Sequence, residues 1–296
     1  MKILLPLDGS ALSETALPVA RALAERWKAE VLLARVVDPF VAAAPGVLPS
    51  LAVRMNSVEQ EAAARYLDGI RFPGSVTRHA TGSPREALVR LAAEEGADLV
   101  VMASHGRSGL KRWLLGSVAE AVLRESPCPV LLVRPSRRSE DGFRHILVPV
   151  DGSEPSLAVL QRLAPYLAAG GRVTLLRASD LVIHDSAQLL APAVREAYLR
   201  SLELDLQQQK LEGVEVDPRV LDGEAADAIL TLAEEVGCDL IAMSSHGRTG
   251  LKRLVLGSVA EKVARHAPCP VLVFPPATRH TQQSSQKINP PQEVYP

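Results

Sequence analysis

One segment of this 296-residue chain occurs twice, and this repeat constrains the fold more than any other feature. The segment Met102–Val133 returns as Met243–Phe274, with identical residues at 22 of 32 aligned positions. Internal similarity at a fixed spacing is typical of chains built from equivalent structural units. At this length each unit has enough residues to bury a core of its own. The sequence therefore predicts two domains of the same fold in tandem.

Both halves alternate short apolar runs with helical patterns. The apolar runs of the first half are Lys2–Asp8, Glu30–Val37, Val76–Ala80, Asp98–Met102 and Pro129–Val133. Those of the second half are His145–Asp151, Arg172–Arg177, Val214–Val220, Cys238–Met243 and Pro270–Phe274. Helical patterns lie between them, the first over Ser10–Trp27 and others beginning at Ser83 and Ser117. This alternation predicts an α/β fold: two tandem doubly wound domains, each a five-stranded parallel sheet with helices on both faces.

Composition places the domain limits. We expect a first domain over 1–135, a linker over 136–143 and a second domain over 144–276. Residues 277–296 are polar, rich in proline and without periodicity, so they are expected to form a disordered tail.

Two loops are nearly identical in the two halves. The motif P-x-D-G-S occupies Pro6–Ser10 and Pro149–Ser153, and S-H-G-x9-G-S begins at Ser104 and Ser245. Glycines let a ligand approach the backbone closely, and a helix N-terminus attracts anions. Ser117, with Glu three residues later, is expected to cap that helix. The pattern favours a phosphate-binding loop, and the alternative is a capped helix after a solvated basic loop.

These motifs resemble the universal stress protein family. The resemblance lies in P-x-D-G-S, in a G-x-x-G-x9-G-S/T nucleotide motif and in the final strand P-C-P-V-L-V, and it covers both halves. It implies the strand order 3-2-1-4-5 in each domain and a nucleotide site between strands one and four. The implied ligand is ATP, with or without Mg²⁺, and the implied role is a nucleotide-dependent module in stress response or signalling.

The resemblance also implies which residues bind the nucleotide. In the first half they are Pro6, Asp8, Val36, Met102, Ala103, Gly106, Arg107, Gly116, Ser117 and Val118. In the second half they are Pro149, Asp151, Ala178, Met243, Ser244, Gly247, Arg248, Gly257, Ser258 and Val259. The aspartates with Val36 or Ala178 would face adenine and ribose, and the motif residues that follow the fourth strand would trace the nucleotide to its phosphates. Arg107 and Arg248 would steer the triphosphate.

The chain departs from the motif at its first glycine, which is Ala103 in one half and Ser244 in the other. A Cβ there narrows the approach to ribose or phosphate. Ala178, where the family has a valine, makes the second adenine wall shallower. We therefore expect the first site to bind nucleotide better than the second.

Two other functions stay open: a slow nucleotide hydrolase, and a scaffold whose sites hold no nucleotide. The sequence offers no evident Ser or Cys nucleophile with a positioned base, and no Lys-Ser/Thr phosphate loop. His105 and His246 are interpreted as structural loop residues, and no metal site is expected. Cys128 and Cys269 are interpreted as small buried hydrophobic residues, and Cys238 aligns with Ala97, which argues against a role.

Charge and hydropathy restrict the partners. The formal net charge is −1 and 23% of residues are charged, so the chain has no strong positive charge that would attract nucleic acid or an anionic membrane. No apolar run reaches the roughly 18 residues that a membrane-spanning helix requires. Three cysteines form no disulfide framework, so a reducing, cytoplasmic location is expected.

The last strand of each half, Pro129–Val133 or Pro270–Phe274, is apolar and lies at a sheet edge in the implied order. An exposed apolar edge is an aggregation hazard. We therefore predict that the two edges pair antiparallel, so that the halves form a pseudo-twofold dimer within one chain. The alternatives are two independent domains, or pairing between chains, which would give a homodimer.

Overall fold

The computed structural model describes residues 1–39, 49–104, 115–134, 142–179, 196–197, 199–201, 214–247 and 256–276. The first half contains β1 (Lys2–Pro6), α1 (Ala11–Glu14), α2 (Leu17–Trp27), β2 (Glu30–Val37), α3 (Pro49–Gly69), β3 (Ser75–Thr81), α4 (Pro84–Glu94), β4 (Leu99–Ala103), α5 (Ser117–Glu125) and β5 (Val130–Val133). The second half contains β6 (Phe143–Pro149), α6 (Glu154–Gln161), β7 (Leu167–Ser179), β8 (Glu215–Asp222), α8 (Ala225–Val236), β9 (Leu240–Ser244), α9 (Ser258–His266) and β10 (Val271–Phe274). The predicted α/β class is confirmed, and the tail expected after residue 276 lies outside the described residues.

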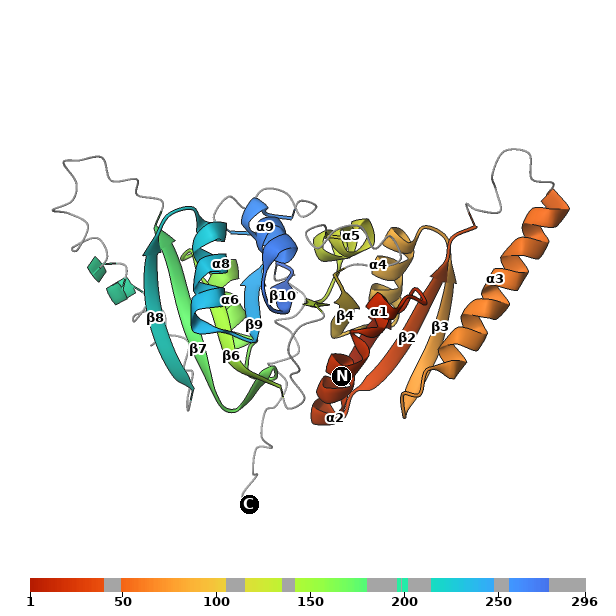
Figure 1. Cartoon of the computed structure of the whole chain (residues 1–296), viewed down its shortest axis with the longest axis horizontal. Coiled ribbons are helices and arrows are strands. Elements are labelled where there is room, and N and C mark those ends of the chain that lie inside the picture. The colour runs from red at the N-terminus through yellow and green to blue at the C-terminus, as the bar shows by residue number, and fades with distance from the viewer. Residues whose placement is uncertain are drawn as a thin grey trace, which may run out of the picture.

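All of these strands belong to one sheet, in the order β3-β2-β1-β4-β5-β10-β9-β6-β7-β8. Each half has the parallel order 3-2-1-4-5 that was expected. Only β5 and β10 run antiparallel, with Leu131 opposite Leu272. The predicted pairing of the two last strands is thus confirmed, and the halves lie side by side across this seam (Figure 1).

The hydrophobic core runs through both halves on each face of the sheet. Successive residues of a strand point to opposite faces. Leu131 accordingly packs in one cluster with Leu5 and Leu272, whereas Leu132 packs in the other with Val271. Because each cluster contains residues from both halves, the β5–β10 seam is buried on both faces of the sheet. The two halves therefore share a continuous core on each face.

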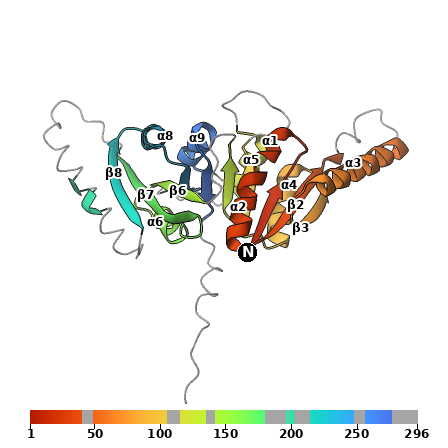
Figure 2. The same ribbon diagram turned by 60° about the horizontal axis from the view of Figure 1, so that its bottom comes forward.

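Contacts outside the sheet also join the halves. The indole Nε1 of Trp27 in α2 donates to the Pro165 carbonyl at 2.9 Å. The rings of Trp27 and Tyr166 pack in a T-shape, with their centres 5.1 Å apart. Across the seam, Arg265 of α9 lies 3.3 Å from the Glu120 carboxylate of α5. The two helices flank the seam in Figure 2. These contacts fix the orientation of one half relative to the other.

Several boundaries differ from the prediction; β7, for example, begins at Leu167 and not at Arg172. The helix expected over Ser10–Trp27 is divided into α1 and α2, because Pro18 has no N–H to continue the hydrogen bonds of the first helix. Phe143, assigned to the linker, begins β6: its side chain is buried and its N–H donates to the Tyr166 carbonyl at 3.1 Å.

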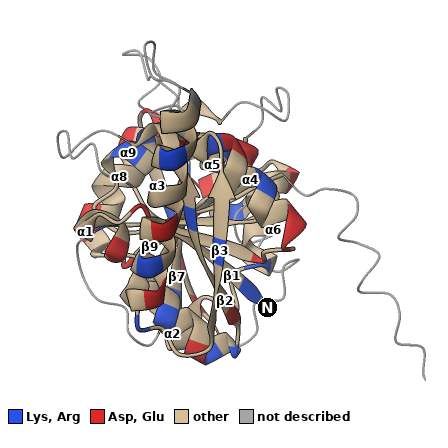
Figure 3. Cartoon of the chain, turned by 90° about the vertical axis from the view of Figure 1, so that its right-hand side faces the viewer, with Lys and Arg blue, Asp and Glu red and all other residues tan. Residues whose placement is uncertain are grey.

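Acidic and basic residues are interspersed over the helices seen from the α3 side (Figure 3). This distribution agrees with the balanced charge of the sequence. Among the described helices, none combines the length and the apolar character needed to cross a membrane.

Candidate functional site

A pocket of about 560 Å³ opens at the carboxyl ends of β1, β2 and β4. It lies where the sheet order reverses, since β1 has β2 on one side and β4 on the other. Ligands of doubly wound sheets bind at such switch points. Helices α3, α4 and α5 supply the remaining walls, the first through Glu59 and Ala62.

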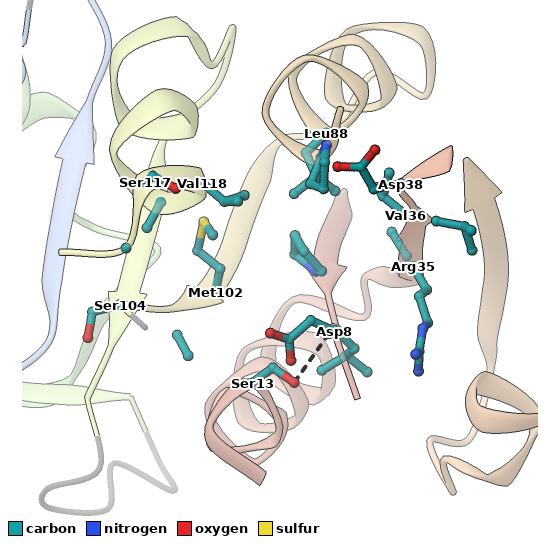
Figure 4. Close-up of a pocket in the computed structure, with 18 of the residues that line it drawn as sticks. Asp8, Ser13, Arg35, Val36, Asp38, Leu88, Met102, Ser104, Ser117 and Val118 are labelled. Atoms are coloured by element: carbon teal, nitrogen blue, oxygen red, sulfur yellow. Dashed lines mark hydrogen bonds between the residues drawn. The ribbon is translucent and has the colours of Figure 1, made fainter. Parts of the chain in front are cut away.

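The predicted first-half residues converge on this pocket. Those that line it are Pro6, Asp8, Val36, Met102, Ala103, Gly116, Ser117 and Val118. Gly106 and Arg107 lie outside the described residues. Figure 4 shows Ser117 and Val118 on one side of the pocket, Val36 and Asp38 on the other, and Asp8 with Ser13 between them.

Several lining residues were not predicted from the sequence: Ser13, Arg35, Asp38, Glu59 and Leu88. Asp38 directly follows β2, so its place after a buried strand was an available signal. Glu59 had no comparable signal, because its position depends on how α3 packs against β2 and β3.

The P-x-D-G-S motif forms a tight turn that fixes the aspartate. Asp8 Oδ1 accepts hydrogen bonds from the N–H of Ser10 at 2.9 Å and from its hydroxyl at 2.6 Å. Gly9 has φ +84°, a left-handed conformation that favours glycine. The Ser10 hydroxyl then accepts from the N–H of Ser13 at 3.1 Å and caps α1. The turn holds the Asp8 carboxylate at the pocket wall.

The second half builds the same turn. Asp151 Oδ1 accepts from the N–H of Ser153 at 2.9 Å and from its hydroxyl at 2.6 Å. The repeated motif therefore has a local structural purpose, namely to place a carboxylate where β1 or β6 ends.

The start of α5 corrects a prediction. Ser117 is the first residue of the helix and Gly116 is the N-cap, with no side-chain hydrogen bond to the first turn. Gly116 is held instead through its backbone: its N–H donates to the Ser104 carbonyl at 3.0 Å, and its carbonyl accepts from Glu120 at 2.9 Å. The expected capping box is wrong because glycine occupies the cap position. The first turn of α5 therefore reaches the pocket without a side-chain cap.

Helix α4 also begins without a side-chain cap. It starts at Pro84 after Ser83, whose side chain makes no capping hydrogen bond. Pro84 removes one N–H from the first turn, so fewer donors need a partner there.

The second glycine loop has matching geometry at its helix. Gly257 is the N-cap of α9, with φ −61° and ψ 144°, close to −63° and 142° at Gly116. Ser258 and Val259 begin α9, Met243 and Ser244 end β9, Pro149 ends β6 and Ala178 lies in β7. Arg248 lies outside the described residues.

Gly247 lies directly on the Asp151 carboxylate. A Cβ added to Gly247 would overlap Asp151 Oδ2, so a larger residue there would require the carboxylate to move. The hydroxyl of Ser244 donates to the His246 carbonyl, and that of Ser245 is 2.9 Å from His246 Nδ1. In the second half, Gly247 therefore lies close to the aspartate that would face a nucleotide.

Arg35, at the pocket wall, is placed by an aromatic ring. Its guanidinium lies 4.8 Å from the ring centre of Tyr66 in α3. The Tyr66 hydroxyl donates to Glu14 at 2.9 Å, and burial together with this carboxylate raises the pKa of Tyr66 to about 12. The phenol thus stays neutral near pH 7 and tethers α3 to α1 beside the pocket.

Within the part of the chain that the structure describes, no three His, Cys, Asp or Glu side chains gather closely enough to hold a metal ion. The groups that the first-half pocket offers to a ligand are its carboxylates, its apolar walls and the N-terminus of α5.

Comparisons with known proteins agree with this architecture. The model of the universal stress protein family matches residues 1–134 and again 142–275. A universal stress protein of Methanocaldococcus jannaschii is 35% identical over 144 residues, which cover 46% of this chain and 85% of that protein. One of Mycolicibacterium smegmatis is 26% identical over 288 residues, or 93% of this chain and 97% of that protein.

A solved structure shows the same fold over the whole length. The crystal structure of a universal stress protein from Archaeoglobus fulgidus covers 93% of this chain and 96% of its own, with a TM-score of 0.66 at 24% identity. Two family matches in one chain, each with a full set of five strands, leave one conclusion. The chain belongs to the universal stress protein family, with two family domains in tandem.

Proposed function

We propose that the first-half pocket binds ATP and that the chain acts as a nucleotide-responsive module in stress response or signalling. The observation that carries this proposal is the N-terminus of α5, which reaches the pocket at Gly116, Ser117 and Val118 without a side-chain cap. Backbone N–H groups and the positive end of the helix dipole attract phosphate at such a position.

The rest of the pocket fits a nucleoside. Val36, Leu88 and Met102 form apolar walls of the kind that enclose a flat base. The carboxylates of Asp8 and Asp38 accept hydrogen bonds from the hydroxyl or amino groups of a nucleoside. Asp38 lies across the pocket from α5, and a carboxylate repels phosphate. The pocket therefore orients the ligand with its phosphates toward α5 and its nucleoside toward β2.

The second half is proposed as the weaker site. It has the same turn at Asp151 and the same helix start at Gly257. However, Gly247 lies against Asp151, and Ala178 offers less apolar surface than Val36. A nucleotide that uses the Asp151 carboxylate would have to fit beside Gly247.

Replacing Ser117 with proline tests the phosphate site. Proline at the first helical position is well tolerated, and Gly116 already has the extended ψ that a following proline requires. The substitution removes one backbone N–H and the hydroxyl. A hydrogen bond to a charged group contributes about 1.5–3 kcal/mol, so we expect ATP affinity to fall about tenfold or more in calorimetry.

Ser258→Pro is the matched control, since Ser258 begins α9 as Ser117 begins α5. It is expected to leave the stronger ATP site unchanged. Both variants should melt within a few degrees of the parent, which separates lost binding from lost folding. Equal ATP affinity in Ser117→Pro and the parent, with the pocket intact, would show that phosphate does not bind at α5.

A further inference from the structure

Two thiols lie in contact in the second half. Cys238 Sγ and Cys269 Sγ are 3.7 Å apart, and the two residues are only 4% and 6% exposed. Cys238 follows α8 after the C-cap residue Gly237, and Cys269 lies two residues before the start of β10. The adjacent strands β9 and β10 are parallel, with Ile241 opposite Val271, so the residues that precede them come side by side.

The first half lacks this pair. Its equivalent of Cys269 is Cys128, and its equivalent of Cys238 is Ala97. Cys128 Sγ lies 3.6 Å from the hydroxyl of Ser126 instead. Because Ala97 is also buried in the core, an alanine is sufficient for packing at this position. The second thiol therefore adds chemistry that the fold does not require.

We propose that Cys238 and Cys269 are a modification site: they form a reversible disulfide when the chain meets a peroxide. In the first step one sulfur attacks hydrogen peroxide, the O–O bond breaks, and a sulfenic acid and one water form. In the second step the other sulfur attacks the sulfenic sulfur, the S–S bond forms and a second water leaves. Two thiols are oxidised by two electrons, and one peroxide is reduced to two waters.

The surroundings of the pair determine its rate and its product. The hydrogen bond with Cys238 and burial raise the pKa of the Cys269 thiol, so little reactive thiolate is present. Since the thiolate is the nucleophile, oxidation by peroxide should be slow, and burial excludes bulky reagents more than it excludes small peroxide. Once either sulfur is oxidised, the other is already in contact with it, which favours the disulfide over sulfinic acid.

The disulfide would enclose the second glycine loop. Gly247, Gly257 and the whole of α9 lie between the two cysteines in sequence. Cross-linking the residues that precede β9 and β10 restricts the unfolded chain and stabilises the fold around this loop. Oxidation would thus stabilise the second half, which contains Asp151 and the weaker proposed nucleotide site.

Peptide mapping of the full chain tests the proposal. The protein is treated with hydrogen peroxide, alkylated under denaturing conditions, digested and analysed by mass spectrometry. We expect a cross-linked peptide pair that contains Cys238 and Cys269 and that dithiothreitol separates, with Cys128 left as a single thiol. The oxidised chain should melt at a higher temperature than the reduced chain.

The chain itself offers the matched control. Cys238→Ala introduces the residue found at position 97, so the variant should fold like the parent and show neither cross-link nor thermal gain. Incubation to equilibrium in glutathione buffer that is mostly oxidised removes the dependence on rate. Free Cys238 and Cys269 in that buffer, or Cys269 recovered as sulfinic acid after peroxide, would overturn the proposal. Neither readout involves a nucleotide, so failure here leaves the ATP proposal untouched.

Discussion

Replacing Leu272 with proline is expected to lower the free energy of unfolding by about 3 kcal/mol or more. Leu272 is fully buried in the middle of β10, opposite Leu131 of β5 and Ala242 of β9. Proline has no N–H to donate, and its ring does not fit an inner strand. The substitution would destabilise the β5–β10 seam, whose strands contribute residues to both core clusters. Urea unfolding followed by circular dichroism measures it.

Thr77→Pro is the control for this substitution. Thr77 lies in the outer strand β3, opposite Leu33, at the position that Pro218 holds in β8 opposite Leu175. Since the second half already carries a proline there, Thr77→Pro should cost far less than Leu272→Pro. If the two variants lose equal stability, the β5–β10 seam has no special role in holding the chain together.

Phe274→Ala is expected to cost about 3–5 kcal/mol, the range for truncating a buried phenylalanine. Phe274 is 2% exposed and ends β10. The Phe274 and Tyr166 rings pack in a T-shape, with their centres 6.0 Å apart, and the Arg162 guanidinium lies 4.6 Å from the centre of the Phe274 ring. Tyr166 in turn contacts Trp27 of the first half. The substitution would leave a cavity in the aromatic cluster that joins the two halves.

Val133→Ala is the comparison for Phe274→Ala, because Val133 ends β5 at the equivalent position and is also 2% exposed. This substitution removes two buried methyl groups, so the free energy of unfolding should fall by about 2 kcal/mol. Thermal or urea unfolding of both variants gives the difference. A Phe274→Ala loss no larger than that of Val133→Ala would show that the aromatic cluster contributes little beyond ordinary burial.

The sequence by itself determined the architecture. The repeated segment predicted two equal domains, and alternating apolar and helical patterns predicted the order of strands and helices. The apolar runs Pro129–Val133 and Pro270–Phe274 led to the antiparallel seam that the structure contains. These features were predictable because burial of a whole strand or helix face leaves a regular pattern in the chain, whatever the exact neighbours are.

The place of these motif residues at the pocket was also predictable, since Asp8, Met102 and Gly116 lie near strand and helix ends that a doubly wound sheet brings together. The cap of α5 was not. Its sequence satisfied the capping-box pattern, yet Gly116 occupies the cap position, where its N–H donates to the carbonyl of Ser104, the residue after β4.

Tertiary structure alone decided which side chains meet across the fold. Trp27 reaches Pro165 and Tyr166, and Glu59 reaches the pocket, through packing that no local pattern encodes. Cys238 shows the difference most clearly. Alignment compares it with Ala97, its equivalent in the other half, and gives no reason for a thiol. The structure places it against Cys269, because contacts depend on which strands are adjacent and not on which positions are equivalent.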